Sequence, residues 1–386
     1  MTSSTPAATS IPVVLRADAA LRRFRARPAG EIVWLLFLGG CLAPHLAALT
    51  AAFMRPDLID FAAFVDNARA WVAGTPYPAH SRDPNVPHVI LFFVPFTTMP
   101  LGVGLALWMA LSYACVVATV LLVARELRLR PSQPVLWTFA AALAAVPPML
   151  DVVVNGNMIW PLGLLFTHTW LLARRGRAFA AAALLGALAT AKPFVGAFVL
   201  LYLARREWTR AATLIASAAA TLAIAVLATG VEAWTAWFEI VGRISWYDVR
   251  FNASVMGVIA RTWRPDVVVW AAAGVLVAGV TMWRLVRLRP DVDRDWILML
   301  LASLLMAPLG WRYYLCLAIG PVLALWARGV LSPSGRVALL LLAWSPTVSG
   351  VPDTITLQAT IGSLPFWTLA CAWAGFGWRY AKIPAA

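Results

Sequence analysis

The chain has 386 residues, of which 62% are hydrophobic and only 12% are charged, and its mean hydropathy is +0.79. This composition excludes a soluble globular protein and predicts an all-α polytopic membrane protein. The formal net charge is +14, but the basic residues form short clusters between apolar runs. That pattern is typical of loops kept on the cytoplasmic side of a membrane, so no nucleic-acid partner is expected.

Cysteine spacing gives no sign of a metal or disulfide framework. The four cysteines lie within or at the edge of apolar runs, without CxxC spacing, and they are interpreted as packing residues. The chain also lacks the Walker A, GxGxxG, HExxH and GxSxG motifs, and its histidines have no metal-ligand spacing. No metal and no cofactor are therefore expected.

The N-terminal residues 1–28 are predicted to be a disordered, basic and cytoplasmic segment, and 29–382 to form a single transmembrane domain. The first apolar run, 32–53, is too long and too far from the N-terminus to be a cleaved signal peptide. About 10–12 transmembrane or half-membrane helices are expected from the apolar runs, which fall at 32–53, 101–124, 134–150, 157–173, 178–191, 194–204, 211–229, 266–283, 295–309, 313–327, 337–348 and 362–378.

Basic residues give these runs an orientation. With the N-terminus inside and the runs alternating, most of the 31 Lys and Arg residues fall in cytoplasmic loops, and both termini are cytoplasmic. The two long segments 54–100 and 230–265 then face outward. Polar groups collect on this outer face, which favours an enzyme over a pump, because a pump places ionisable groups near the middle of the bilayer.

Near its start, the outer segment 54–100 carries a charged residue, Asp60, at the edge of the membrane hydrocarbon, where a charge costs free energy. Asp60 and Phe64 are four residues apart, so they share one face of a helix. Asp60 is interpreted either as a general base or as a helix cap. Further along, 88–96 is apolar but too short to span, and it either lies in the interface, re-enters the membrane or packs in the core.

Lys192 interrupts a run that is apolar on both sides. Two short helices are expected to meet there, and a single kinked helix is the alternative. Lys192 is interpreted either as a lysine that extends its ammonium toward the interface or as a cation for a phosphate. Arg312, between Trp311 and Tyr313, is a second candidate for the same anion.

The outer segment 230–265 is rich in tryptophan and arginine. This composition is typical of an interfacial aromatic belt, and it also suits a carbohydrate site in which rings stack on sugars. Asn252 and Ser254 match the N-glycosylation pattern, but they are interpreted as hydrogen-bonding groups at the start of a helix.

In order and spacing, several motifs resemble the GT-C polyprenol-phosphate-sugar glycosyltransferases, in particular glycosyltransferase family 87, the DUF2029 group of α-mannosyltransferases. The resemblance covers about 32–330 and is carried by Asp60-Phe61-x-x-Phe64, Gly74-x-x-Tyr77, Met99-Pro100-Leu101, Gly156-Asn157, Gly186 with Ala191-Lys192-Pro193, Asn252-x-Ser254 and Ala307-Pro308-x-x-Trp311-x-Tyr313-Tyr314. The chain departs from the family at Phe64, Asn157, His88 and Tyr313, where the family usually has other residues.

The resemblance implies a GT-C fold and an inverting, metal-independent mannosyltransferase-like enzyme in the cytoplasmic (inner) membrane, with its site on the outer face. The implied partners are a polyprenyl-phosphate sugar donor, a glycolipid or glycan acceptor, and membrane lipids. Asp60 would be the catalytic base, and Lys192 and Arg312 would bind the donor phosphate. The implied substrate- or acceptor-binding residues are Phe64, Tyr77, Asn157, Asn252, Ser254, Trp311 and Tyr313.

Other function classes also fit a helical membrane protein. A transporter or lipid flippase would use broken helices, although no clear internal repeats are present. A glycan ligase or polymerase acting on a lipid-diphosphate donor would need more cations near the phosphate. A structural scaffold has no use for a lysine between apolar half-helices.

Overall fold

A computed structural model describes residues 12–55, 60–75, 85–130, 132–243, 246–329, 335–337, 340, 347–348 and 350–378. Over these residues the protein is helical, and the only β-type pairing among them is an isolated bridge between Asn252 and Trp311. The elements are α1 (Pro12–Arg25), α2 (Pro28–Met54), α3 (Asp60–Val72), η2 (Pro87–Phe96), α4 (Leu101–Glu126), α5 (Pro134–Ala144), α6 (Pro147–Asn155), α7 (Ile159–Arg174), α8 (Ala178–Ala191), η3 (Pro193–Phe198), α9 (Val199–Ala204), α10 (Trp208–Thr229), α11 (Val231–Gly242), η4 (Trp246–Asp248), α12 (Val255–Thr262), α13 (Val267–Arg287), α14 (Val292–Met306), η5 (Arg312–Ala318), α15 (Ile319–Ala327), α17 (Ile355–Ala359), η6 (Ile361–Ser363) and α18 (Leu364–Trp378).

Five helical segments in the described part of the chain are long and apolar enough to cross a membrane: α2, α4, α10, α13 and Ile355–Phe376. A sixth candidate is α5 with α6, which are bent by 66° at the break between them. The bend follows from Val146-Pro147, since the residue before a proline is held extended, here at φ −74° and ψ 146°. The protein is therefore an all-α, multi-pass membrane protein, as predicted.

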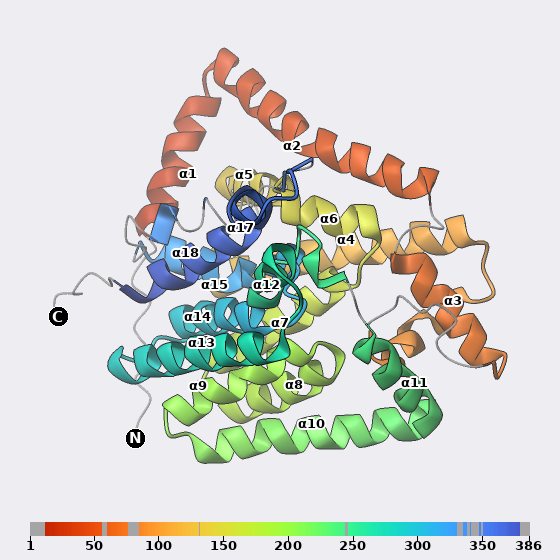
Figure 1. Cartoon of the computed structure of the whole chain (residues 1–386). Helices are drawn as coiled ribbons and strands as arrows, with labels where there is room; N and C mark the ends of the chain where they lie inside the picture. Colours follow the sequence, from red (N-terminus) through yellow and green to blue (C-terminus); the bar gives the residue numbers. More distant parts are fainter. Residues whose placement is uncertain are drawn as a thin grey trace.

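Each predicted apolar run coincides with helix, except that 337–348 lies mostly outside the described residues. The expected break at Lys192 is present, because α8 ends at Ala191, η3 begins at Pro193, and Lys192 between them is extended. In Figure 1, α14 lies near the centre, while α2 and α10 run along opposite edges. Every residue of α14 from Asp293 to Leu305 is buried, so this helix forms the middle of the core.

The N-terminal prediction is wrong for residues 12–25, which form α1 rather than a disordered segment. Asp18 holds this helix in place: it pairs with Arg22 one turn later at 2.7 Å, and its Oδ1 accepts from the backbone N–H of Val135 at 3.4 Å. An i,i+4 pair and a run of alanine and leucine favour helix locally, and the contact with α5 supplies the tertiary packing that a short helix needs.

The apolar segment η2 packs in the core. Phe93 is fully buried, and its ring lies 4.5 Å from that of Phe64 and 4.7 Å from that of Trp108, measured between centroids. Of the three interpretations left open for this segment, the structure favours packing. The resulting aromatic cluster joins η2 and α4 to α3, the helix that begins at Asp60.

A cluster of charged side chains at the start of α14 ties several helix ends together. Arg328 donates to Asp293 at 2.9 Å and to Asp291 at 2.7 Å, and Arg174 lies 3.2 Å from Asp293. Arg205 pairs with Asp295 in the same cluster. We call these residues, with Glu126 and Arg294, the ion cluster.

The ion cluster was not predicted, and it shows that buried charge is not confined to one end of the molecule. α7 and the η5–α15 segment both end in it, at Arg174 and just before Arg328. The opposite ends of the same two segments lie at Asn157 and Arg312, where the polar groups predicted to be functional gather.

Candidate active site

A cavity of about 420 Å³ brings together residues from the beginning, middle and end of the chain. We call it the site cavity. It is lined by six of the predicted site residues, namely Asp60, Phe64, Asn157, Lys192, Trp311 and Tyr313. Asn85, Trp237, Tyr247, Phe251 and Tyr314 also line it.

The carboxylate of Asp60 is oriented by an amide. Asn157 Nδ2 donates to Asp60 Oδ2 at 2.6 Å and lies 3.5 Å from the Tyr313 hydroxyl oxygen. The other end of the amide is fixed too, since Asn157 Oδ1 accepts from the backbone N–H of Ile159 at 3.1 Å. The amide therefore cannot rotate without losing a bond at each end, and it holds the carboxylate at one edge of the cavity.

Local sequence explains where Asn157 points. α6 ends at Gly156, which adopts the left-handed conformation at φ 59° and ψ 32°, a geometry that glycine adopts without strain. Trp108 Nε1 donates to the Gly156 carbonyl at 2.9 Å and so fixes the turn to α4. Asn157 follows directly and is 3% exposed.

Lys192 supplies the ammonium group of the site cavity. Its Nζ donates to Asn85 Oδ1 at 2.9 Å and lies 5.5 Å from the centroid of the Tyr314 ring. The break between α8 and η3 places this lysine where the helices part. A second contact joins the end of α8 to the segment that begins at Asn85, since the Thr190 hydroxyl lies 3.4 Å from His88 Nε2.

Aromatic side chains line another side of the site cavity. The rings of Phe251 and Trp311 lie 4.9 Å apart, and those of Trp311 and Tyr313 lie 6.3 Å apart. Tyr247 adds a phenol whose pKa is raised by burial, so it stays a neutral hydrogen-bonding group. Apolar ring faces beside a few hydrogen-bonding groups suit a sugar, which presents both C–H faces and hydroxyls.

Asn252 and Ser254 do not line the cavity, and both are fully buried. The Asn252 amide donates to the carbonyls of Tyr247 and Pro308 at 2.9 and 3.0 Å and accepts from the Gly310 N–H at 2.9 Å. Ser254 caps α12 by accepting from the Gly257 N–H at 3.1 Å. Both residues lie at the start of a helix, as predicted. Their hydrogen bonds do not reach the cavity, and instead hold the backbone behind the aromatic side chains that line it, which we call the aromatic wall.

Arg312 lies behind the cavity wall. Its Nη2 donates to Asp151 Oδ1 at 2.8 Å and its Nε to Asp151 Oδ2 at 2.5 Å, in a bidentate pair, and the arginine is 8% exposed. This pair joins η5 to α6, so the geometry favours a structural role over phosphate binding. Tyr77, the remaining predicted site residue, lies outside the described residues.

Sequence reasoning missed Asn85, which lies between prolines in a segment with no regular pattern, and Tyr314 as the ring beneath Lys192. No group of three or more potential metal ligands is found in the described part of the chain. A carboxylate, an ammonium group and an aromatic wall around one cavity can remove a proton, stabilise a leaving anion and hold a sugar.

Comparison with protein families gives one match, to the family model described as glycosyltransferase family 87, over residues 85–317. The matched segment includes Asn157, Lys192 and Trp311, while Asp60 precedes it. Neither the curated proteins nor the solved structures include a significant match to this chain. Because the match spans more than half of the chain, the protein belongs to glycosyltransferase family 87 and is a membrane glycosyltransferase rather than a transporter.

Proposed function

We propose that the protein transfers a sugar from a polyprenyl-phosphate donor to a lipid-linked or cell-envelope glycan on the outer face of the cytoplasmic membrane, with inversion at the anomeric carbon. The observation that carries the proposal is that Asp60 and Lys192 line one cavity, which supplies a base and a cation to the same substrate pair. Mannose is the first donor sugar to test, because the motif resemblance implies it.

Asp60 is the general base of the proposed reaction. An acceptor hydroxyl attacks the anomeric carbon, its proton passes to Asp60, and the carbon–oxygen bond to the phosphate breaks with its electron pair leaving on the phosphate. The Asn157 amide occupies Asp60 Oδ2.

Lys192 binds the departing phosphate in this mechanism. Negative charge grows on the phosphate oxygen as the bond breaks, and a fixed ammonium group in the cavity wall stabilises that charge. Asn85 and the Tyr314 ring hold the lysine at the wall of the cavity. We leave Arg312 out of the phosphate site because Asp151 already engages its guanidinium.

The aromatic wall is assigned to the acceptor glycan. The rings of Phe251 and Trp311 line the cavity, and Tyr247 adds a neutral hydroxyl. Outward orientation is supported by the placement of arginines in the loops of the opposite side and by the polar segments that precede α4 and α12.

The test is sugar transfer by the purified protein in lipid nanodiscs, from a panel of radiolabelled polyprenyl-phosphate sugars to extracted membrane acceptors. One sugar is expected to be transferred, and nucleotide sugars are expected to be inactive in the same assay. Product in which the anomeric configuration of the donor is retained would contradict the single-displacement mechanism. Transfer from a nucleotide sugar alone would contradict the assigned donor class.

A further inference from the structure

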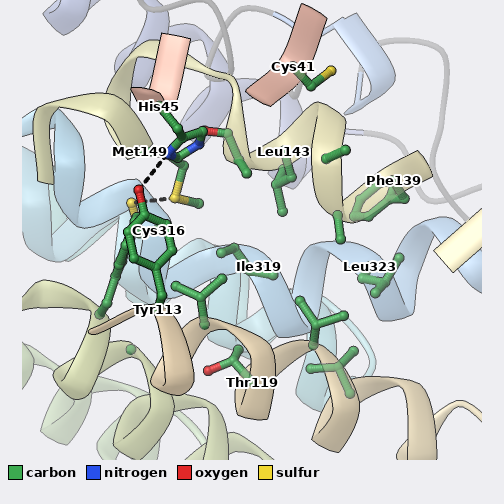
Figure 2. Close-up of a pocket in the computed structure, with 18 of the residues that line it drawn as sticks. Cys41, His45, Tyr113, Thr119, Phe139, Leu143, Met149, Cys316, Ile319 and Leu323 are labelled. Atoms are coloured by element: carbon green, nitrogen blue, oxygen red, sulfur yellow. Dashed lines mark hydrogen bonds between the residues drawn. The ribbon is translucent and has the colours of Figure 1, made fainter. Parts of the chain in front are cut away.

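A second cavity, of about 300 Å³, lies between α2, α4, α5, α7 and the η5–α15 segment. We call it the apolar cavity. Figure 2 shows His45, Tyr113 and Met149 near one end of it and Phe139 and Leu323 toward the other. No lysine, arginine, aspartate or glutamate is among the residues that line it in the described structure.

Among the few polar groups in the apolar cavity, His45, Tyr113 and Thr119 have partners within the protein, while the buried Trp160 indole N–H has no hydrogen-bond partner in the described structure. His45 Nε2 donates to the Ala144 carbonyl at 2.6 Å, and Nδ1 of the neutral ring accepts from the Tyr113 hydroxyl at 3.1 Å. The Thr119 hydroxyl donates to the Cys115 carbonyl at 2.8 Å. The rest of the lining is almost entirely apolar, so the cavity suits a hydrocarbon chain.

The cavity reaches the membrane-facing surface of the protein. Leu42 of α2 lines it and is 56% exposed, and Val120 of α4 lines it beside the exposed Val117 and Leu121. α2 and α4 are both candidate membrane spans, so the medium at this opening is lipid hydrocarbon. Interiors are otherwise close-packed, and an apolar space of this size excludes water.

The apolar cavity is separate from the site cavity, and one wall divides them. On η5, Tyr313 and Tyr314 line the site cavity while Cys316 lines the apolar one. The bidentate pair of Arg312 with Asp151 belongs to this wall. The hydrocarbon chain of a lipid whose phosphate lies at Lys192 therefore begins on the site-cavity side of the wall.

The lack of cationic side chains in the described lining of the apolar cavity favours one kind of lipid chain over another. In a polyprenyl phosphate the chain is bonded directly to the phosphate, so a cavity that holds the start of that chain needs a cation at its mouth. In a glycerolipid an ester and the glycerol separate each acyl chain from the phosphate, so a mouth without cations suffices. We propose that the apolar cavity binds an acyl chain of a membrane glycerolipid, distinct from the sugar donor.

This lipid would brace α2, the helix that comes just before the one beginning at Asp60. α2 packs on α1, α5 and α6, and on the α4 side the His45–Tyr113 hydrogen bond crosses the cavity. An acyl chain there fills the remaining space between α2 and α4. The inference concerns binding alone and does not rest on the proposed sugar transfer.

The test is photolabelling of the whole protein in nanodiscs with a phosphatidylglycerol that carries a diazirine on one acyl chain, followed by mapping of the labelled peptides. Label is expected on Met149 and Ile159, which are 5% and 0% exposed and out of reach of lipids on the outer surface. A polyprenyl phosphate with a diazirine in its chain is the competing probe. Labelling of these two residues by the polyprenyl probe in preference to the acyl probe would overturn the assignment to an acyl chain.

Two pairs of variants show whether the label comes from inside the cavity. Ala140→Phe on α5 and Val120→Trp on α4 add bulk at lining residues, and Ala142→Phe and Val117→Trp add the same bulk at exposed residues of the same helices. Each filling variant is expected to lower the labelling of Met149 and Ile159 about tenfold, equal to about 1.4 kcal/mol of binding free energy. The exposed variants are expected to label as the unmodified protein does.

The proposal is overturned if the filling variants keep full labelling, or if the unmodified protein is labelled only at exposed residues such as Leu42. Because the second outcome is read on the unmodified protein, the test remains decisive even if a filling variant fails to fold. Size-exclusion chromatography of each variant before labelling identifies that case.

Discussion

Charged side chains lie at both ends of α7 and of the η5–α15 segment, in the ion cluster at one end and in the site cavity at the other. The hydrogen bonds that these side chains make differ between the two ends. In the ion cluster, aspartates meet arginines: Asp293 lies 2.9 Å from Arg328 and 3.2 Å from Arg174. In the site cavity, the Asn157 amide donates a hydrogen bond to Asp60, and Lys192 donates one to the Asn85 amide.

The difference separates charged groups that stabilise the fold from charged groups that take part in the proposed reaction. An opposite charge compensates the cost of burial but also neutralises the group that it pairs with. An amide orients a carboxylate or an ammonium and leaves its formal charge in place. Variants at the two ends should therefore fail in different ways, with loss of stability at the ion cluster and loss of transfer at the site cavity.

The largest effect on transfer is expected for Asp60→Asn. This change keeps the size of the side chain and removes the proton acceptor, so kcat should fall about 10²- to 10⁴-fold. The measurement is initial-rate sugar transfer with matched amounts of folded protein. The control is Asp66→Asn on the same helix, whose carboxylate pairs with Arg69 at 3.2 Å near the surface and should be dispensable. Near-normal turnover by Asp60→Asn would sink the assignment of the base.

Asp293→Ala should cause the largest loss of stability. The aspartate is 1% exposed, and its removal breaks its pairs with Arg328 and Arg174, which keep Asp291 and Glu126 as partners. Breaking a buried pair by removing one member costs about 3–5 kcal/mol. Thermal unfolding in detergent measures the change, and transfer per folded molecule should be unaltered. Glu239→Gln, which removes one member of an exposed pair with Arg243, is the control and should change stability little. If Asp293→Ala were as stable as this control, the ion cluster would not be structural.

Lys192→Met keeps the length of the side chain and removes its charge. Loss of a group that stabilises a developing anion costs about 10²- to 10³-fold in kcat. Lys192→Arg should recover part of the rate, since it restores the charge in a different shape. The two variants are compared by single-turnover transfer at saturating donor. Equal rates for methionine and arginine would show that charge at this position does not serve the leaving phosphate.

Much of the fold follows from hydropathy alone. The apolar runs, the break at Lys192 and the helical class were all predicted, because hydrophobic periodicity and proline act locally. α1 was missed because its order depends on contacts of Asp18 and Val14 with distant helices, which local composition does not encode. The ion cluster is signalled in the sequence by three aspartates at alternate positions before an apolar run, but Arg174, Arg205 and Arg328, which pair with them, lie at the ends of three other helices.

The site was harder to predict than the fold. Motif order selected Asp60, Asn157 and Lys192, which line one cavity, but the same reasoning placed Arg312 and Asn252 there as well. Both are functional-looking polar residues whose hydrogen bonds close on the protein itself, with Asp151 and with backbone carbonyls. A sequence gives the type of a side chain, and only the packed structure gives its partner.

The smallest expected effect probes the amide partner directly. Asn85→Ala removes the acceptor of the Lys192 hydrogen bond, which is worth about 1 kcal/mol, or about fivefold in kcat/KM for the donor. Asn85→Asp keeps the acceptor and adds a negative charge beside Lys192. That aspartate would compete with the donor phosphate, and we expect a loss of about tenfold, greater than that of the alanine variant. Donor titrations at fixed acceptor measure both values. A fully active Asn85→Asp enzyme would mean that added negative charge beside Lys192 does not weaken binding of the donor phosphate.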